Sequence, residues 1–248
     1  MSFFSKLFGI DKAPQLDNFD WLGTDFHSHL IPGIDDGSKS MEDTLQLVQG
    51  LQKIGFKKVI TSPHIMTDGY NNSSDAIRSG RDKVRDALAK QNINMPFDAI
   101  AEYYLDESIF PKIKARDILT TENNYVLVEL SYFNKSFNTS KYFFELISAG
   151  YKVILAHPER YPYFHSDDLE EYQNIIDSGV SLQLNLTSLT GVYGKGAKNM
   201  AEKLIDSGMI HFAATDLHNM RHLSYLHKCF ESPYLAKLKA LPLHQHLL

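Results

Sequence analysis

The pattern of apolar and polar residues predicts a unit that repeats along most of the chain: an amphipathic helix, a glycine and a short apolar run. The first helix is expected over residues 40–54, with Ser40 and Asp43 as a capping box at its start. Gly55 follows its end, where a glycine can take a positive φ. The same pattern predicts helices over residues 74–90, 139–149, 166–178 and 195–207, and from about residue 222.

The apolar runs between these helices are predicted to be strands. They cover residues 21–29, 57–64, 96–104, 125–130, 152–160, 181–186 and 209–218. Strands that alternate with helices imply a mainly parallel sheet, and seven such units without a linker indicate an α/β fold in the form of a closed or nearly closed barrel. The sequence has no compositional break, so we expect one domain over residues 21–248, preceded by an N-terminal extension over residues 1–20.

Composition excludes several classes of protein. A net charge of -5 with 22% charged residues argues against a nucleic-acid partner. Cys229 is the one cysteine, which excludes an intrachain disulfide framework and fits a cytoplasmic location. The chain has no apolar run of about eighteen residues, so no transmembrane segment is expected. The first fourteen residues fit a signal peptide poorly and instead predict a short amphipathic helix that packs on the domain or a partner, with membrane-surface contact as the alternative.

Histidines and carboxylates recur at the predicted strand ends. His27 and His29 are two residues apart on a strand, which points both imidazoles to one face. Alone, this pair is better explained as packing or surface histidines, but the carboxyl ends of barrel strands meet on one side of the molecule. The full candidate set is His27, His29, Asp36, His64, Glu102, Glu129, His157, Asp216 and His218. Five imidazoles and four carboxylates are enough for two or three ions with shared carboxylates, and a mixed set of histidines and carboxylates without thiolates favours Mn, Fe or Zn over a purely oxygen-bound Mg site.

A cluster of divalent ions favours a phosphate dianion, so metal-assisted hydrolysis of a phosphoester is the natural reaction class. Arg160 follows His157 by three residues, and its planar fork suits two phosphate oxygens, with a surface salt bridge to Glu159 or to an acidic residue of a helix as the alternative. Arg221 is a second candidate for substrate binding. Asp25 is expected either to orient an imidazole or to be a buried aspartate without that role.

Ordinary packing is an explanation for two further sets of residues. The remaining histidines are expected on the surface or in the core, and they include His165, His211, His222, His244 and His246. Aromatic residues after the strand ends are candidates for a rim around a phosphotyrosine ring, with packing as the alternative: Tyr103, Tyr104, Tyr132, Phe133, Tyr161, Tyr163, Phe164 and Tyr193.

Six motifs together resemble a known family. DFHSHLIPGIDDG, TSPH, AEYY, VLVEL, AHPERY and ATDLHN occur in this order along nearly the whole chain. They resemble the polymerase and histidinol phosphatase (PHP) superfamily, and within it the bacterial PHP-type protein-tyrosine phosphatases of capsule and exopolysaccharide gene clusters. The resemblance implies a distorted (β/α)7 barrel with three divalent metal ions, typically Mn, with Fe, Zn or Mg as alternatives.

The resemblance also implies roles for individual residues. One ion would be held by His27, His29, Glu102 and Asp216, the second by Glu102, Glu129 and His157, and the third by Asp36, His64 and His218. Arg160 would bind the phosphate, and His64 or His218 would assist the reaction.

The implied function is hydrolysis of protein phosphotyrosine on a membrane-associated bacterial tyrosine autokinase that controls polysaccharide export. Three alternatives remain: a small-molecule phosphatase of the histidinol-phosphatase type, a PHP exonuclease, or a metal-bound scaffold that docks on a kinase without turnover. The exonuclease is disfavoured because the chain lacks a basic surface for DNA.

Overall fold

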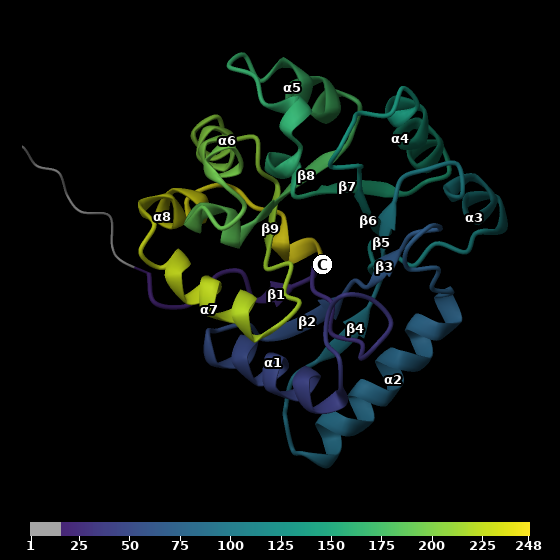
Figure 1. Cartoon of the computed structure of the whole chain (residues 1–248), viewed down its shortest axis with the longest axis vertical. Coiled ribbons are helices and arrows are strands. Elements are labelled where there is room, and N and C mark those ends of the chain that lie inside the picture. Colours follow the sequence, from purple (N-terminus) through teal and green to yellow (C-terminus); the bar gives the residue numbers. More distant parts are fainter. Residues whose placement is uncertain (1–15) are drawn as a thin grey trace, which may run out of the picture.

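Parallel strands surround one interior, and helices lie around the outside of this ring (Figure 1). The computed structural model describes residues 16–248, so the predicted N-terminal amphipathic helix lies outside the described residues. The strands are β1 (Thr24–Asp25), β2 (Lys58–Thr61), β3 (His64–Ile65), β4 (Phe97–Ala99), β5 (Glu102–Tyr104), β6 (Tyr125–Glu129), β7 (Lys152–Ala156), β8 (Ser181–Asn185) and β9 (Phe212–Ala214). They pair in the orders β1-β2-β4 and β3-β5-β6-β7-β8-β9, and every pair is parallel.

The two sheets join because β2 continues into β3 and β4 continues into β5, each after a break of two residues. At the other edge, an isolated parallel bridge links Ser28 to Leu217, and the amide of His29 donates to the carbonyl of Leu217 over 2.9 Å. The predicted α/β barrel of parallel strands is therefore confirmed. Its distortion lies in these breaks and in the single bridge between its first and last strands.

The helices largely match the predicted units. They are α1 (Met41–Lys53), α2 (Ser74–Lys90), α3 (Ile109–Ala115), α4 (Thr139–Ser148), α5 (Glu170–Asp177), α6 (Lys195–Asp206), α7 (Met220–Cys229) and α8 (Pro233–Lys239). The Ser40 hydroxyl accepts from the amide of Asp43, which caps α1 as expected. Helix α5 begins four residues later than predicted because Leu169 has a left-handed φ of 56°, which a helix cannot contain. The short helix α3 was not predicted.

Alternation along the strands separates an inner core from an outer one. In β6, Tyr125 and Leu127 belong to the cluster inside the barrel, whereas Val126 and Val128 pack outward against the helices. The period of two therefore directs Glu129 to the inside, at the carboxyl end of the strand. Glu129 thus continues the inner face at the point where apolar residues stop.

Two predicted strands are shorter in the structure because the backbone turns at candidate ligands. The strand expected over residues 152–160 ends at Ala156, since His157 has a left-handed φ of 36°. Likewise, only Phe212–Ala214 of residues 209–218 is regular, and Asp216 has a φ of 51°. Such conformations cost about 1–3 kcal/mol in non-glycine residues and concentrate at functional sites.

The amino ends of the strands are covered by the end of the chain. The side chain of Gln245 accepts from the amide of Ala213 over 3.3 Å and donates to the carbonyls of Thr24 and Ala213. Leu247 and Leu248 pack against the inner cluster. Gln245 thus connects the first and last strands at the end of the barrel opposite the candidate ligands.

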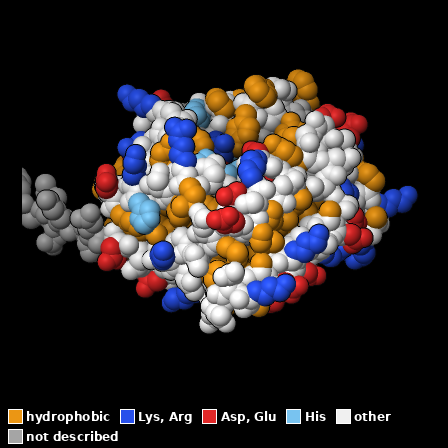
Figure 2. All heavy atoms as spheres, turned by 60° about the horizontal axis from the view of Figure 1, so that its bottom comes forward, with side chains coloured by type: hydrophobic (Ala, Val, Ile, Leu, Met, Phe, Trp, Pro, Cys, Tyr) orange, Lys and Arg blue, Asp and Glu red, His pale blue; other side chains and the backbone are white. Residues whose placement is uncertain are grey.

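In residues 16–248, no helix is long and apolar enough to cross a membrane. On the face shown in Figure 2, Lys and Arg side chains are interspersed with Asp and Glu. This face therefore has no extended basic area.

Candidate metal centre

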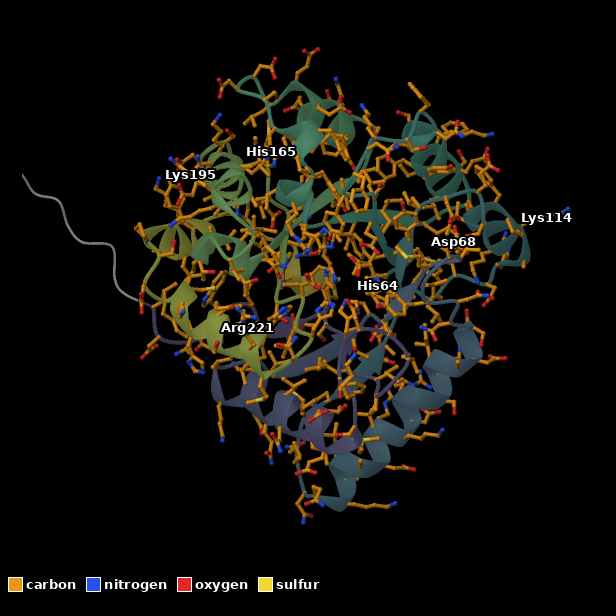
Figure 3. The ribbon with its side chains drawn as sticks, in the orientation of Figure 1. His64, Asp68, Lys114, His165, Lys195 and Arg221 are labelled. Carbon is orange, nitrogen blue, oxygen red and sulfur yellow. The ribbon has the colours of Figure 1, made fainter. Side chains whose placement is uncertain are left out.

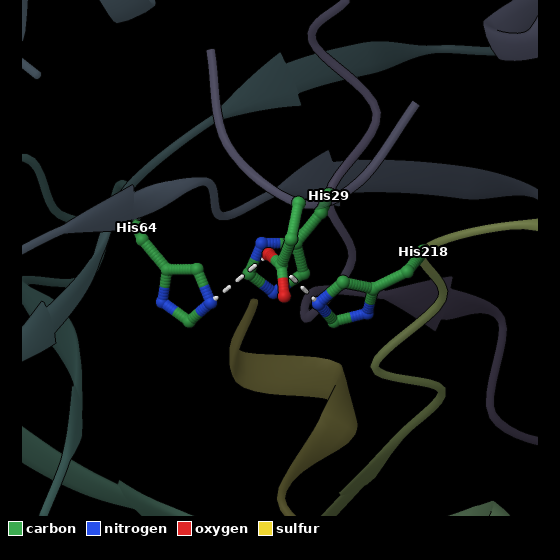
Figure 4. A group of neighbouring side chains, drawn as sticks. His29, His64 and His218 are labelled. Carbon is green, nitrogen blue, oxygen red and sulfur yellow. Dashed lines mark ion pairs between the residues drawn. The ribbon is translucent and has the colours of Figure 1, made fainter. Parts of the chain in front are cut away.

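The structure brings all nine candidate ligands together at the carboxyl ends of the strands. They form four overlapping groups whose ligand atoms lie within 4.8 Å of one another. These groups are His27, His29 and Asp216; His27, Glu102 and His157; His64, Glu102 and Glu129; and His29, Asp36, His64 and His218. Figure 4 shows His29, His64 and His218 of the last group, and Asp36 pairs with His64 and His218 over 3.5 and 3.4 Å.

Glu102 lies at the centre of the cluster. Its Oε2 atom is 3.2 Å from Nε2 of His27, 3.4 Å from Nε2 of His29 and 3.2 Å from Nδ1 of His64. The other oxygen, Oε1, is 3.0 Å from Nε2 of His157. One carboxylate therefore faces four imidazoles, which is the arrangement expected of a ligand shared between neighbouring cations.

The donor atoms fit divalent cations. Within the part of the chain that the structure describes, five buried donor atoms of the cluster have no hydrogen-bond partner: Nε2 of His27 and His29, Nδ1 of His64, Oε2 of Glu102 and Oε1 of Glu129. Buried polar atoms without partners cost about 1–3 kcal/mol each, so such a concentration requires an explanation. These atoms converge on common points, and cations at those points would satisfy them. The mixed imidazole and carboxylate set suits Mn, Fe or Zn.

Protonation in the absence of cations follows from the same contacts. Burial alone would lower the pKa of His64, but Glu102, Asp36 and Glu129 together raise it to about 10. The pKa of His157 instead falls to about 4, because of burial and the nearby Arg160. His157 is therefore neutral and ready to bind a cation at pH 7, whereas His64 must first lose a proton.

The Nδ1 atoms of two candidate ligands, His27 and His29, are hydrogen-bonded to residues that the sequence analysis did not identify. Nδ1 of His27 donates to Oε1 of Gln183 over 2.8 Å, and Nδ1 of His29 donates to Oδ2 of Asp35 over 2.8 Å. These contacts direct both Nε2 atoms towards the cluster. Asp25 does not orient an imidazole: its carboxylate accepts from the amide and hydroxyl of Thr215. Of the two alternatives for Asp25, the structure shows the second.

All the candidate ligands except His27 and His29 border a cavity of about 330 Å³, which is also lined by an arginine and two aromatic residues. Cζ of Arg160 is 4.8 Å from the ring centre of Tyr132 and 4.1 Å from that of Tyr193. Its Nη1 donates to Oδ2 of Asp216 over 2.7 Å. Arg160 is therefore part of the cavity, and the alternative of a surface salt bridge with Glu159 is wrong.

Two other predictions about the rim differ from the structure. Arg221 does not line the cavity: it lies on α7, where its Nε donates to the hydroxyl of Tyr225 over 2.6 Å (Figure 3). His222, which was expected on the surface or in the core, lines the cavity. The reason is that α7 begins at Met220, directly after the ligand loop, which turns the first helical residues back towards the site.

The aromatic candidates divide between the two alternatives. Tyr132 and Tyr193 line the cavity. Tyr103, Tyr161 and Phe164 are buried in the core, whereas Phe133 is 94% exposed.

Fold and site together define an α/β-barrel protein with a candidate metal centre at the carboxyl ends of its strands. Residues 23–237 match the family described as "Capsular polysaccharide synthesis, CpsB/CapC", and the chain belongs to this family.

Two proteins of similar sequence have the term tyrosine-protein phosphatase in their names. The chain is 26% identical over 198 residues to the tyrosine-protein phosphatase YwqE of Bacillus subtilis (strain 168), which covers 79% of this chain and 78% of YwqE. It is 26% identical over 205 residues to the putative tyrosine-protein phosphatase CapC of Staphylococcus aureus, covering 82% of this chain and 80% of CapC.

Solved structures give the same picture. One similar structure comes from a study of YwqE from Bacillus subtilis and CpsB from Streptococcus pneumoniae, which are described as metal-dependent tyrosine phosphatases. Its TM-score is 0.76 at 25% identity, and the match covers 84% of this chain and 86% of that chain. A phosphotriesterase homology protein from Escherichia coli, with a TM-score of 0.51 at 15% identity over 84% of this chain and 87% of that one, shares the fold alone.

Proposed function

We propose that residues 21–248 form a metal-dependent phosphatase that hydrolyses phosphotyrosine in proteins. One observation carries this proposal: buried imidazole and carboxylate atoms without partners converge beside Arg160 in one cavity. The family and the named activities of its similar members support the same chemistry. A cavity of about 330 Å³ is at the small end of ligand pockets, which favours a single phosphorylated side chain over a larger ligand.

The proposal includes three divalent cations, with Mn as the expected metal. The groups around His27, His29 and Asp216 and around Asp36, His64 and His218 support the first and third ions of the assignment. For the second ion, Glu102 and Glu129 share one group, while His157 joins Glu102 through a different one. We therefore propose Glu102 as the ligand common to the ions on both sides of it.

Bound cations supply Lewis acidity that lowers the pKa of water and neutralises charge on phosphate. The chain's own residues bind and orient the substrate. Arg160 has one guanidinium nitrogen on Asp216, which leaves its other donors for phosphate oxygens. Tyr132 and Tyr193 line the same cavity and offer ring faces to the tyrosyl group. Because a phenol leaving group has a pKa of about 10, help from a strong general acid is not required.

The proposed substrate is a membrane-associated bacterial tyrosine kinase, and the proposed location is the cytoplasm. The family description, which refers to capsular polysaccharide synthesis, supports this choice. The resemblance of the sequence motifs to capsule-cluster phosphatases supports it as well.

The test is to remove metal with EDTA, restore it with Mn²⁺ and compare a phosphotyrosine peptide with histidinol phosphate at equal concentration. We expect turnover of the peptide only after Mn²⁺ is restored. Replacing both His27 and His29 by alanine should abolish turnover, while the same change at the exposed His227 and His246 controls for loss of two histidines. Full activity of the metal-free protein would contradict the mechanism, and preference for histidinol phosphate would contradict the substrate.

A further inference from the structure

The end of β8 and the connection from β8 to α6 contain no candidate metal ligand, yet one side chain from each contacts a group that is central to the site. Nδ2 of Asn185 donates to Oδ2 of Asp216 over 2.9 Å, and Asn185 is fully buried. The ring of Tyr193 lies against the guanidinium of Arg160. Neither side chain belongs to a group of potential ligands.

The contact with Asn185 separates the roles of the two oxygens of Asp216. Oδ1 lies 3.3 Å from Nε2 of His27 and 3.5 Å from Nε2 of His29, so it faces the proposed cations. Oδ2 accepts from Asn185 and Arg160 instead. Asp216 has a left-handed φ, so regular strand geometry does not fix its direction. The orientation of its carboxylate therefore depends on these two donors.

The amide of Asn185 is itself held in one orientation. Its Oδ1 accepts from the amide of Thr187 over 3.0 Å and from the hydroxyl of Thr187 over 2.8 Å. Because the oxygen is occupied by these donors, the nitrogen must face Asp216. The backbone amide of Asn185 also donates to Oε1 of Glu159 over 3.1 Å, and the hydroxyl of Ser188 donates to the same oxygen over 2.6 Å.

Tyr193 acts on Arg160 in a comparable way. Tyr193 and Tyr132 each present a ring to the guanidinium of Arg160, at 4.1 and 4.8 Å from Cζ. A planar cation packed against ring faces is stabilised and keeps its plane, which preserves the direction of the donors not used by Asp216.

We propose that Asn185 and Tyr193 are positioning residues: Asn185 keeps Oδ1 of Asp216 directed at the metal groups, and Tyr193 keeps Arg160 directed into the cavity. The role of Tyr193 rests on the proposed phosphatase function, whereas that of Asn185 requires only that the site binds cations. The end of β8 and the connection that follows it thus support the site by contacting Asp216 and Arg160 instead of supplying a metal ligand.

The first test measures Mn²⁺ affinity of metal-free protein by calorimetry, without turnover. Asn185→Leu removes the donor at similar size, and Asn185→Asp keeps the oxygen that accepts from Thr187 while it removes the donor. Partners of ligands typically change metal affinity by about 10- to 100-fold, so we expect a loss of that size in both variants. Circular dichroism and melting of the metal-free proteins identify variants that retain the fold. A folded variant that binds Mn²⁺ within about threefold of wild type would overturn the role of Asn185.

The second test uses inorganic phosphate as a competitive inhibitor of p-nitrophenyl phosphate hydrolysis. Tyr193→Leu should weaken phosphate inhibition and raise KM by about fivefold, with a smaller effect on kcat, whereas Tyr193→Phe keeps the ring and should recover most of the affinity. Tyr225→Leu is a matched control, because Tyr225 contacts the exposed Arg221 with its ring centre 5.7 Å from Cζ. Equal damage from Tyr193→Phe and Tyr193→Leu, or unchanged inhibition in Tyr193→Leu, would overturn the role of the ring.

These outcomes are separable from the proposed function. Wild-type protein that hydrolyses p-nitrophenyl phosphate but not a phosphotyrosine peptide would contradict the proposed substrate while leaving both positioning roles intact. Wild-type turnover of the peptide together with normal Mn²⁺ binding by a folded Asn185 variant would contradict the inference alone.

Discussion

Replacing Glu102 by glutamine is the most direct test of the shared-ligand arrangement. The substitution keeps the size of the side chain but replaces a carboxylate oxygen with an amide nitrogen, which cannot bind a cation. Oε2 faces His27, His29 and His64, while Oε1 faces His157, so the amide of glutamine can offer an oxygen to one side only and has no negative charge for the ions on either side.

The expected magnitude follows from this double role. Disturbing the partner of a ligand costs up to about 100-fold in metal affinity, and the loss of the carboxylate charge on both sides, together with the ligand oxygen on one side, should cost at least that for each of two ions. Together this is about 10⁴-fold, or about 5.5 kcal/mol. A partial offset is expected because Glu102 raises the pKa of His27 and His64 against the effect of burial, so the variant has fewer protons to displace.

The assay is metal content by mass spectrometry after equilibration in micromolar Mn²⁺, combined with turnover of a phosphotyrosine peptide. Glu102→Gln should retain fewer ions than wild type and lose at least about 10³-fold in kcat/KM. Glu122→Gln is the control, because it makes the same chemical change at an exposed position. An unchanged number of ions in Glu102→Gln, bound within tenfold of wild-type affinity, would refute the view that this carboxylate is shared.

Three further predictions concern protons, packing and substrate. The pKa of His64 is about 10 in the metal-free site, so Mn²⁺ binding should release a proton, and the affinity for Mn²⁺ should fall by up to about tenfold per pH unit between pH 8.5 and 6.5. Calorimetry in two buffers of different ionisation enthalpy measures the released proton and the affinity. An affinity that does not change with pH would contradict the prediction. In Gly37→Ala, the new Cβ would overlap the carbonyl and Cβ of His29, so the free energy of unfolding in urea should fall by about 3 kcal/mol. In Gly208→Ala the space around the new Cβ is open and only the positive φ is strained, so the expected loss of stability is about 1 kcal/mol. Arg160→Lys loses the planar fork, so KM for the peptide should rise about tenfold in steady-state assays, and an unchanged KM would exclude Arg160 from phosphate binding.

Much of the fold follows from local pattern. Helix α2 covers the predicted residues 74–90, and Ser40 and Gly55 mark the ends of the first helix unit as expected. The period of two in residues 125–129 also leads to an inward Glu129. These features depend on short-range spacing and on helix-end residues, which a single sequence displays directly.

Other parts of the site depend on backbone geometry that spacing does not reveal. Ile154 and Ala156 face inward, so strict alternation would turn His157 outward, and only its left-handed φ brings the imidazole to the cluster. Gln183 and Asn185 were missed because amides in a strand are ordinary. A signal existed, however: the inward positions of SLQLNL are polar where β6 and β7 have apolar residues.

Asp35 and Arg221 illustrate a further limit of motif matching. Asp35 and Asp36 are neighbours with the same chemistry, yet one bonds His29 from behind while the other faces the cavity. Arg221 is close in sequence to His218, but the course of α7 carries it away from the opening. Three-dimensional direction decides the role of each residue in these cases.

Gln245 gives the last residues of the chain influence over the opposite end of the molecule. His27 and His29 follow β1, and Asp216 and His218 follow β9, so the candidate metal ligands lie on both sides of the contact between the first and last strands. Gln245 connects the same two strands at their amino ends. The substitution Gln245→Leu removes these hydrogen bonds, so β1 and β9 should separate and the candidate ligands that follow them should move apart. The effect would resemble the loss of a metal ligand although every ligand is still present. Inactivating changes recovered in a genetic screen should therefore include this remote tail, and added Mn²⁺ should rescue them where it fails to rescue true ligand mutants.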